Sequence, residues 1–263
     1  MIQWLEYQQV YMPSAFLDLD AAALADLGIH GEDVYFKTAD EVGLHGWFFP
    51  ARPGSPRAHL VFLIFHGNGG NIGNRLEFYR AWLGLGVSVF VFDYRGYGRS
   101  AGRPSEEGTY QDGEAALAWL RQKGFGPGQV ILLGKSLGGG VAAEIAMRQP
   151  VGGLILQNTF TSLPDLASEM YPWFPVRSMC TIHYNTIDKL PRVRVPVLVL
   201  HSRNDELIHF RHAERNFKAA NEPKMFREVL GWHNGALEAG RKQYLLGLEE
   251  FLAAYYPSPI FSA

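Results

Sequence analysis

Short apolar runs recur along the chain and predict most of its strands. A strand covered on both faces by other elements is apolar almost throughout, so a short run of apolar residues indicates a buried strand. Such runs occupy residues 60–65, 87–92, 130–133, 154–156 and 197–200. Two opening strands are predicted at 33–37 and 44–49, joined by a turn, and a last strand at 225–230.

Helical patterns fill the intervals between these runs. Apolar positions spaced three or four apart predict helices at 76–83, 110–123 and 137–147, and a long amphipathic helix at 237–255. Strands that alternate with helices form a mostly parallel sheet with helices on both faces. The predicted fold class is therefore α/β, as a single domain over residues 1–263.

The interval 158–196 interrupts this alternation. It contains five prolines and the aromatic residues Tyr171, Trp173 and Phe174. Connections in compact domains have a median length of only about 4–6 residues, so this interval is too long for an ordinary loop. We interpret it as a short cap of helical segments over one end of the sheet. A packed surface segment without a role in binding is the alternative.

Composition and charge narrow the possible functions. Apolar residues make up 47% of the chain and charged residues 19%, which excludes intrinsic disorder. The net charge of −2 is not concentrated anywhere, so a nucleic-acid-binding surface is not expected. One cysteine cannot form an intramolecular disulfide or a Cys-based zinc site. No apolar segment is long enough to span a membrane and no signal peptide is evident, so we expect a cytoplasmic protein without an integral membrane anchor.

The most informative motif is Gly-x-Ser-x-Gly at residues 134–138, between a predicted strand and a predicted helix. A serine at such a sharp turn projects its hydroxyl from the end of the sheet, and the glycines let strand and helix pack closely. Ser136 is therefore the candidate nucleophile. A phosphate-binding P-loop is excluded, because position 129 is glutamine and residues 130–133 are a strand. A plain turn that happens to contain serine is the alternative.

A nucleophile of this kind needs N–H donors for the negative charge that develops on the attacked oxygen. The main-chain N–H of Leu137 is one candidate, and that of Asn68, in the glycine-rich segment 66–71, is the other. The alternative is that the glycines of this segment only permit a tight turn. The segment 93–100 is a third glycine cluster, in which we interpret Asp93 as a structural residue that pairs with Arg95 or caps a turn.

The serine also needs a base, and the base needs a carboxylate that orients it. Of nine histidines, His233 follows the last strand and lies in a glycine-flanked loop that is expected at the same sheet edge as Ser136. Asp205 follows the strand at 197–200 and is expected at that edge too. The weaker carboxylate candidates are Glu206, Asp165 and Asp188. The predicted triad is thus Ser136, Asp205 and His233, in the order Ser, Asp, His along the chain.

The chain resembles the α/β-hydrolase superfamily, and within it the Bem46-like or α/β-hydrolase-domain-containing serine hydrolases. The resemblance covers nearly the whole chain and rests on the segments 66–71, 93–100, 134–138 and 160–163, on Asp205 and on His233-Asn234. It implies an eight-stranded sheet whose second strand is antiparallel, and a short cap after the sixth strand. It also implies that Ser136, Asp205 and His233 are nucleophile, acid and base, with Asn68 and Leu137 as oxyanion donors. Lys135, Ser202 and Gly235 depart from the common pattern without removing a catalytic group.

The predicted function is that of a cofactor-free, metal-free serine hydrolase, which cleaves small carboxylic esters or thioesters through an acyl-enzyme. Phe160, Tyr171, Trp173 and Phe174 of the cap are expected to form an apolar substrate pocket. Two alternatives remain at this point. One is a non-catalytic ligand- or partner-binding protein on the same scaffold. The other is an acyltransferase or perhydrolase that uses the same site.

Overall fold

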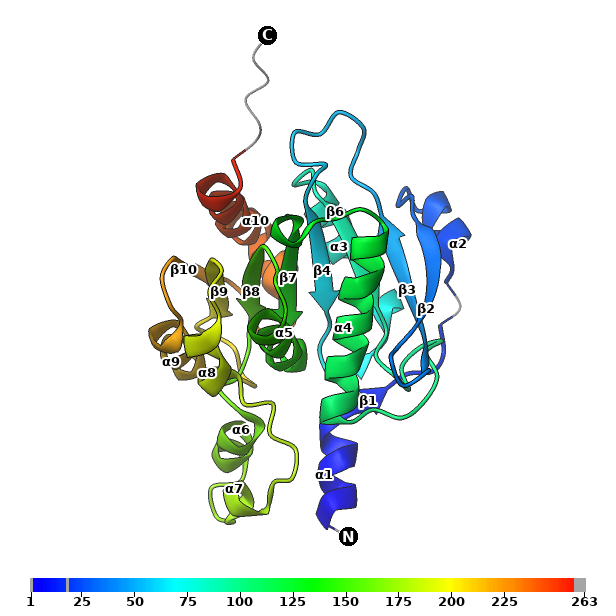
Figure 1. The fold of residues 1–263 in the computed structure, drawn as a ribbon. Coiled ribbons are helices and arrows are strands. Elements are labelled where there is room, and N and C mark those ends of the chain that lie inside the picture. The colour runs from blue at the N-terminus through cyan, green and yellow to red at the C-terminus, as the bar shows by residue number, and fades with distance from the viewer. Residues whose placement is uncertain (1, 18, 258–263) are drawn as a thin grey trace.

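A twisted eight-stranded sheet forms the centre of the molecule (Figure 1). The computed structural model describes residues 2–17 and 19–257. Along the sheet the strands follow the order β2, β3, β6, β4, β7, β8, β9, β10. Their bounds are Glu32–Lys37 (β2), Gly43–Phe49 (β3), Val61–Phe65 (β4), Ser88–Phe92 (β6), Val130–Lys135 (β7), Gly153–Gln157 (β8), Val197–Ser202 (β9) and Lys224–Val229 (β10).

Only β3 runs in the opposite direction to the other strands of this sheet. It pairs antiparallel with β2 and with β6, and all the other pairs are parallel. The predicted α/β fold, with eight strands and an antiparallel second strand, is therefore confirmed. Parallel strands all end at the same edge, so the loops that follow β4, β7, β8, β9 and β10 meet there.

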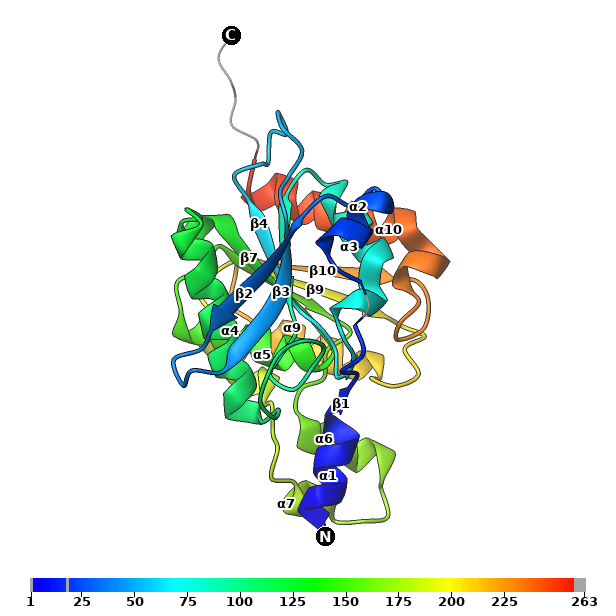
Figure 2. The same ribbon diagram turned by 90° about the vertical axis from the view of Figure 1, so that its right-hand side faces the viewer.

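Helices cover both faces of the sheet because alternate strand residues point to opposite sides (Figure 2). In β4, Val61, Leu63 and Phe65 pack into a core cluster with α4 and α5, whereas Phe62 and Ile64 pack into one with α3 and α10. The helices are Leu76–Leu83 (α3), Glu106–Gln122 (α4), Leu137–Arg148 (α5), Phe210–Ala219 (α9) and Ala236–Tyr255 (α10), together with Ala21–Asp26 (α2) near β2.

The helix α4 begins four residues before its predicted start at 110. Ser105 caps it, because its hydroxyl accepts a hydrogen bond from the Gly108 N–H at 3.0 Å. Glu106 and Glu107 then occupy the first turn, where the helix dipole favours negative charge. Because the first residues of this helix are polar, the spacing of apolar residues did not predict its start.

The interval 158–196 contains three short helices and a 3₁₀ turn, and only part of it extends beyond the sheet. The helices α6 (Leu163–Met170) and α7 (Val176–Met179) lie below the sheet in Figure 1. The short helix α8 (Thr186–Lys189) instead packs against α5 and α9, and a 3₁₀ turn, η3 (Leu190–Arg192), leads to β9. None of the helices in the described part of the chain is long and apolar enough to cross a bilayer.

The N-terminal segment contributes elements that the apolar pattern did not predict. A helix, α1 (Ile2–Val10), lies beside α6 and α7 in both views (Figures 1 and 2). The strand β1 (Met12–Pro13) then pairs in parallel with β5 (Gly69–Gly70), inside the glycine-rich segment 66–71. A 3₁₀ turn, η1 (Ile72–Arg75), connects β5 to α3, and another, η2 (Pro127–Gln129), precedes β7.

Candidate active site

Ser136 lies at a sharp turn between β7 and α5 with a backbone φ of +53°. This is a strained conformation for a residue that carries a Cβ. The two motif glycines are required by close packing: a Cβ on Gly134 would lie 2.4 Å from the Gly138 carbonyl oxygen, and one on Gly138 would lie 2.0 Å from that of Phe65. The packing of strand against helix thus holds Ser136 in a conformation that presents its side chain at the sheet edge.

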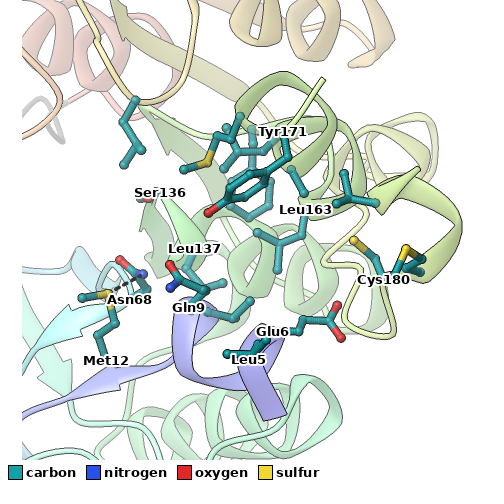
Figure 3. A pocket seen from close by; sticks show the side chains of 18 of the residues that line it. Leu5, Glu6, Gln9, Met12, Asn68, Ser136, Leu137, Leu163, Tyr171 and Cys180 are labelled. Atoms are coloured by element: carbon teal, nitrogen blue, oxygen red, sulfur yellow. Dashed lines mark hydrogen bonds between the residues drawn. The ribbon is translucent and has the colours of Figure 1, made fainter. Parts of the chain in front are cut away.

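Both candidate oxyanion donors belong to residues that line the same pocket as Ser136. Leu137 is the first residue of α5, where helical N–H groups have no partner within the helix. Asn68 belongs to a loop fixed from two sides, since its carbonyl oxygen accepts hydrogen bonds from the Tyr97 hydroxyl at 2.8 Å and the Met12 N–H at 3.1 Å. Ser136, Leu137 and Asn68 all line one pocket (Figure 3).

Asp205 and His233 form a buried hydrogen-bonded pair. Asp205 Oδ2 is 2.8 Å from His233 Nδ1, and its other oxygen accepts the N–H groups of Leu207 at 3.0 Å and Ile208 at 2.8 Å. Burial by itself raises the pKa of Asp205, but the hydrogen bond and the charge of His233 outweigh it, so the pKa lies below the usual value. The side chain is therefore a carboxylate near neutral pH, with one oxygen aimed at the imidazole.

The three other candidate carboxylates do not contact the His233 ring and have other partners. Glu206 accepts a hydrogen bond from the His233 main-chain N–H at 2.9 Å and so holds the backbone rather than the ring. Asp165 is bonded to Thr161, Arg177 and Arg215, and Asp188 to Asn185.

Two contacts join the loop of His233 to the turn of Ser136, and neither was predicted from the sequence. The Asn158 amide donates to the His233 carbonyl at 3.0 Å, while the neighbouring Gln157 carbonyl accepts the Ser136 N–H at 3.0 Å. Lys135 Nζ donates to Asn234 Oδ1 at 2.5 Å. The residues next to Ser136 and His233 in the chain are thus bonded directly to each other. The backbone of Asn158 has a positive φ of 46°.

Lys135, the residue before Ser136, has a half-buried side chain, which is unusual for a lysine. Burial lowers its pKa to about 8, with repulsion from Arg75 adding to this and attraction by Asp205 opposing it. Between about pH 8 and the ordinary lysine pKa near 10.5, the unfolded chain therefore holds a proton that the folded chain has released. Over this range Lys135 makes the free energy of unfolding rise with pH.

Replacing Lys135 with methionine should remove this dependence. The free energy of unfolding of Lys135→Met minus that of the wild type should fall as pH rises from about 8 to about 10, by up to about 1 kcal/mol per pH unit. Urea denaturation at several pH values measures the difference. Loss of the hydrogen bond to Asn234 lowers the stability of Lys135→Met by the same amount at every pH. A difference in the free energy of unfolding that does not change with pH would therefore contradict the lowered pKa of Lys135.

The pocket beside Ser136 has a volume of about 600 Å³, within the range of small-molecule sites. Of the four aromatic residues predicted to line it, Phe160, Tyr171 and Phe174 do so. The prediction for Trp173 is wrong: its side chain is 92% exposed and does not line the pocket. Sequence reasoning also missed an entire wall, which α1 provides.

Of the two structural roles predicted for Asp93, the structure shows the turn cap and not the pair with Arg95. Arg95 binds Asp112 and Asp40, each at 2.8 Å. Asp93 Oδ1 instead accepts the N–H of Ile72, the first residue of η1, at 2.9 Å and lies 3.4 Å from His66 Nε2. Asp93 thus caps the turn that follows the loop of Asn68. Within residues 2–17 and 19–257, no three His, Cys, Asp or Glu side chains are grouped as a metal site would require.

Comparisons with known proteins agree with this architecture. Residues 61–179 match the family model described as the alpha/beta hydrolase fold. The chain is 37% identical over 233 residues to an uncharacterized protein of Mycobacterium tuberculosis, a match that covers 88% of this chain and 81% of the other. It is 33% identical to alpha/beta hydrolase domain-containing protein WAV2 of Arabidopsis thaliana, over 89% of this chain and 82% of the relative. The chain belongs to the α/β-hydrolase superfamily.

The predicted resemblance to Bem46-like and α/β-hydrolase-domain-containing proteins is thereby confirmed. Among solved structures, this α/β-hydrolase is similar to an esterase of Pyrococcus furiosus, with a TM-score of 0.75 over 93% of this chain and 99% of the other. The two sequences are only 17% identical, so this likeness concerns the fold.

Proposed function

We propose that this α/β-hydrolase is a serine hydrolase that cleaves carboxylic esters or thioesters through an acyl-enzyme. The observation that carries the proposal is the strained turn of Ser136, which opens on an apolar pocket and is bonded, through Lys135 and Asn234, to the loop of the His233–Asp205 pair. A binding protein has no need of a strained serine at the sheet edge together with a histidine that is hydrogen-bonded to a buried carboxylate.

The proposed reaction follows from the roles of these groups. Ser136 Oγ attacks the acyl carbon while the His233 imidazole takes the hydroxyl proton. Asp205 keeps the proton of the imidazole on Nδ1, so that Nε2 is the basic nitrogen. The N–H groups of Leu137 and Asn68 stabilise the oxyanion. His233 then gives its proton to the leaving alcohol or thiol, and a water molecule activated by His233 hydrolyses the acyl-enzyme.

Covalent labelling tests whether the serine is reactive. A fluorophosphonate should phosphonylate Ser136, and the intact mass of the wild type should increase by one phosphonyl group while that of Ser136→Ala does not change. The control is Ser178→Ala, which removes an exposed hydroxyl of α7 that donates to the Pro175 carbonyl. This variant should label like the wild type. A wild type that stays unlabelled would favour the non-catalytic binding protein.

A further inference from the structure

The N-terminal helix forms one wall of the pocket that contains Ser136 (Figure 3). Leu5, Glu6, Gln9 and Val10 of α1 line this wall, followed by Met12 of β1. The opposite wall consists of residues from α6 and α7 and the turn between them: Leu163, Leu166, Ala167, Met170, Tyr171, Phe174, Val176 and Met179. The distance between α1 and these cap helices therefore sets the width of the pocket.

The carboxylate of Glu6 fixes this distance. Its Oε1 accepts the main-chain N–H groups of Thr181 at 2.8 Å and Ile182 at 3.0 Å, and its Oε2 accepts the Thr181 hydroxyl at 2.6 Å. Hydrogen bonds to a charged acceptor are among the stronger ones in proteins. A single side chain thus ties α1 to the backbone that leaves the cap.

A second contact anchors the other end of α1. The hydroxyl of Tyr11, the residue after α1, lies 3.0 Å from that of Tyr184, and both side chains are fully buried. Glu6 and Tyr11 are more than one helical turn apart, so the two contacts together define the orientation of the helix and not only its position.

Polar groups are distributed unevenly along the pocket. The side-chain amides of Gln9 and Asn68 lie toward Ser136 and Leu137, while Cys180 lies toward the other end (Figure 3). Both oxygens of Glu6, the charged group in the lining, are already bonded to residues 181 and 182. A ligand that fits this pattern has its polar ester group at Ser136 and an apolar chain directed toward Cys180 and Met179.

We propose that a linear acyl chain binds between α1 and the cap helices, and that Glu6 is a positioning residue that makes the site selective for long chains. This inference rests on the proposed hydrolase function. Loss of the Glu6 contacts should leave α1 free to move away from the cap, so that the far part of the pocket no longer encloses a chain. The distal methylenes of a long acyl group would then lose their contacts, whereas an acetyl group reaches only the region near Ser136.

Kinetics with p-nitrophenyl esters of increasing acyl length test this proposal. In the wild type, kcat/KM should rise about two- to fourfold per added methylene from acetate until the pocket is filled. In Glu6→Ala, the ratio of the decanoate to the acetate value should fall about tenfold or more, mainly through KM. Glu6→Gln keeps one acceptor oxygen and should give an intermediate ratio. Gln8→Ala, an exposed position on α1 outside the pocket lining, should keep the wild-type ratio.

The outcomes separate this proposal from the proposed function. A wild type that hydrolyses none of the esters would contradict the hydrolase itself, whereas equal ratios in Glu6→Ala and the wild type would overturn only the role of Glu6. Should Glu6→Ala fail to fold, Leu5→Trp is the second variant. It places a larger side chain on the same wall, narrows the pocket and should lower the decanoate-to-acetate ratio of kcat/KM. The isomers ethyl decanoate and decyl acetate decide which part of the ester binds the pocket. Preference for decyl acetate would overturn the acyl assignment.

Discussion

Ser136→Ala should lower the turnover of p-nitrophenyl esters by about 10⁶-fold, because the members of a triad act as a unit and the acyl-enzyme cannot form without the hydroxyl. The substitution keeps the Cβ, and the backbone at 136 already holds a φ of +53° with a Cβ present. Alanine should therefore adopt the same turn without new contacts. Steady-state hydrolysis measures the loss, and active-site titration with a fluorophosphonate corrects for inactive wild-type protein.

Two checks separate lost chemistry from lost structure. The circular dichroism spectrum and thermal midpoint of Ser136→Ala should match those of the wild type. Binding of a non-hydrolysable ketone analogue of the substrate should persist, because the pocket walls are unchanged. Hydrolysis by the variant within about tenfold of the wild-type rate would show that another group is the nucleophile.

The second large effect is expected for Asp205→Asn, which should reduce kcat by about 10³- to 10⁴-fold. The asparagine carbonyl should keep the place of Oδ1, which accepts the N–H groups of Leu207 and Ile208. Its NH₂ group would then face His233 Nδ1 in place of the carboxylate oxygen. The imidazole would have to accept there, which leaves its proton on Nε2 and unable to take another from Ser136.

Asp188→Asn provides the matched control for this change. Asp188 accepts a hydrogen bond from the Asn185 amide and does not contact His233, so the variant should retain wild-type kcat. The stability of Asp205→Asn needs separate measurement, because the side chain also holds the loop 205–208. An Asp205→Asn enzyme with wild-type kcat would remove Asp205 from the proposed mechanism.

The sheet could be predicted from sequence because its strands are buried on both faces. A run such as residues 61–65 is apolar at every position since each face meets a different helix layer. The helix α1 could not be found in this way. Tyr7 and Val10 of this helix pack against the core, but the helix also combines exposed apolar residues such as Trp4 with polar ones. Its sequence therefore has no clear apolar face.

The sequence predicts which residues of the candidate site lie at one sheet edge and their order along the chain. It does not predict the hydrogen bonds that connect their loops. Strand ends determine which loops share an edge, which is why Asp205 and His233 could be named before their hydrogen bond was seen. Side-chain direction in an irregular segment has no such periodic rule. Trp173 therefore looked equivalent to Phe174 in the sequence but points into solvent. The bond between Lys135 and Asn234 likewise depends on two loops that no short-range pattern relates.

The pairing of β1 with β5 affects how this protein can be handled. The first elements of the chain line the pocket and hold the loop of Asn68, whereas the end of α10 lies at the opposite end of the sheet (Figure 1). A purification tag or surface linker placed ahead of α1 would pull on the helix that forms a pocket wall and on that loop. Attachment beyond α10 avoids both elements, which makes it the better choice for immobilised assays.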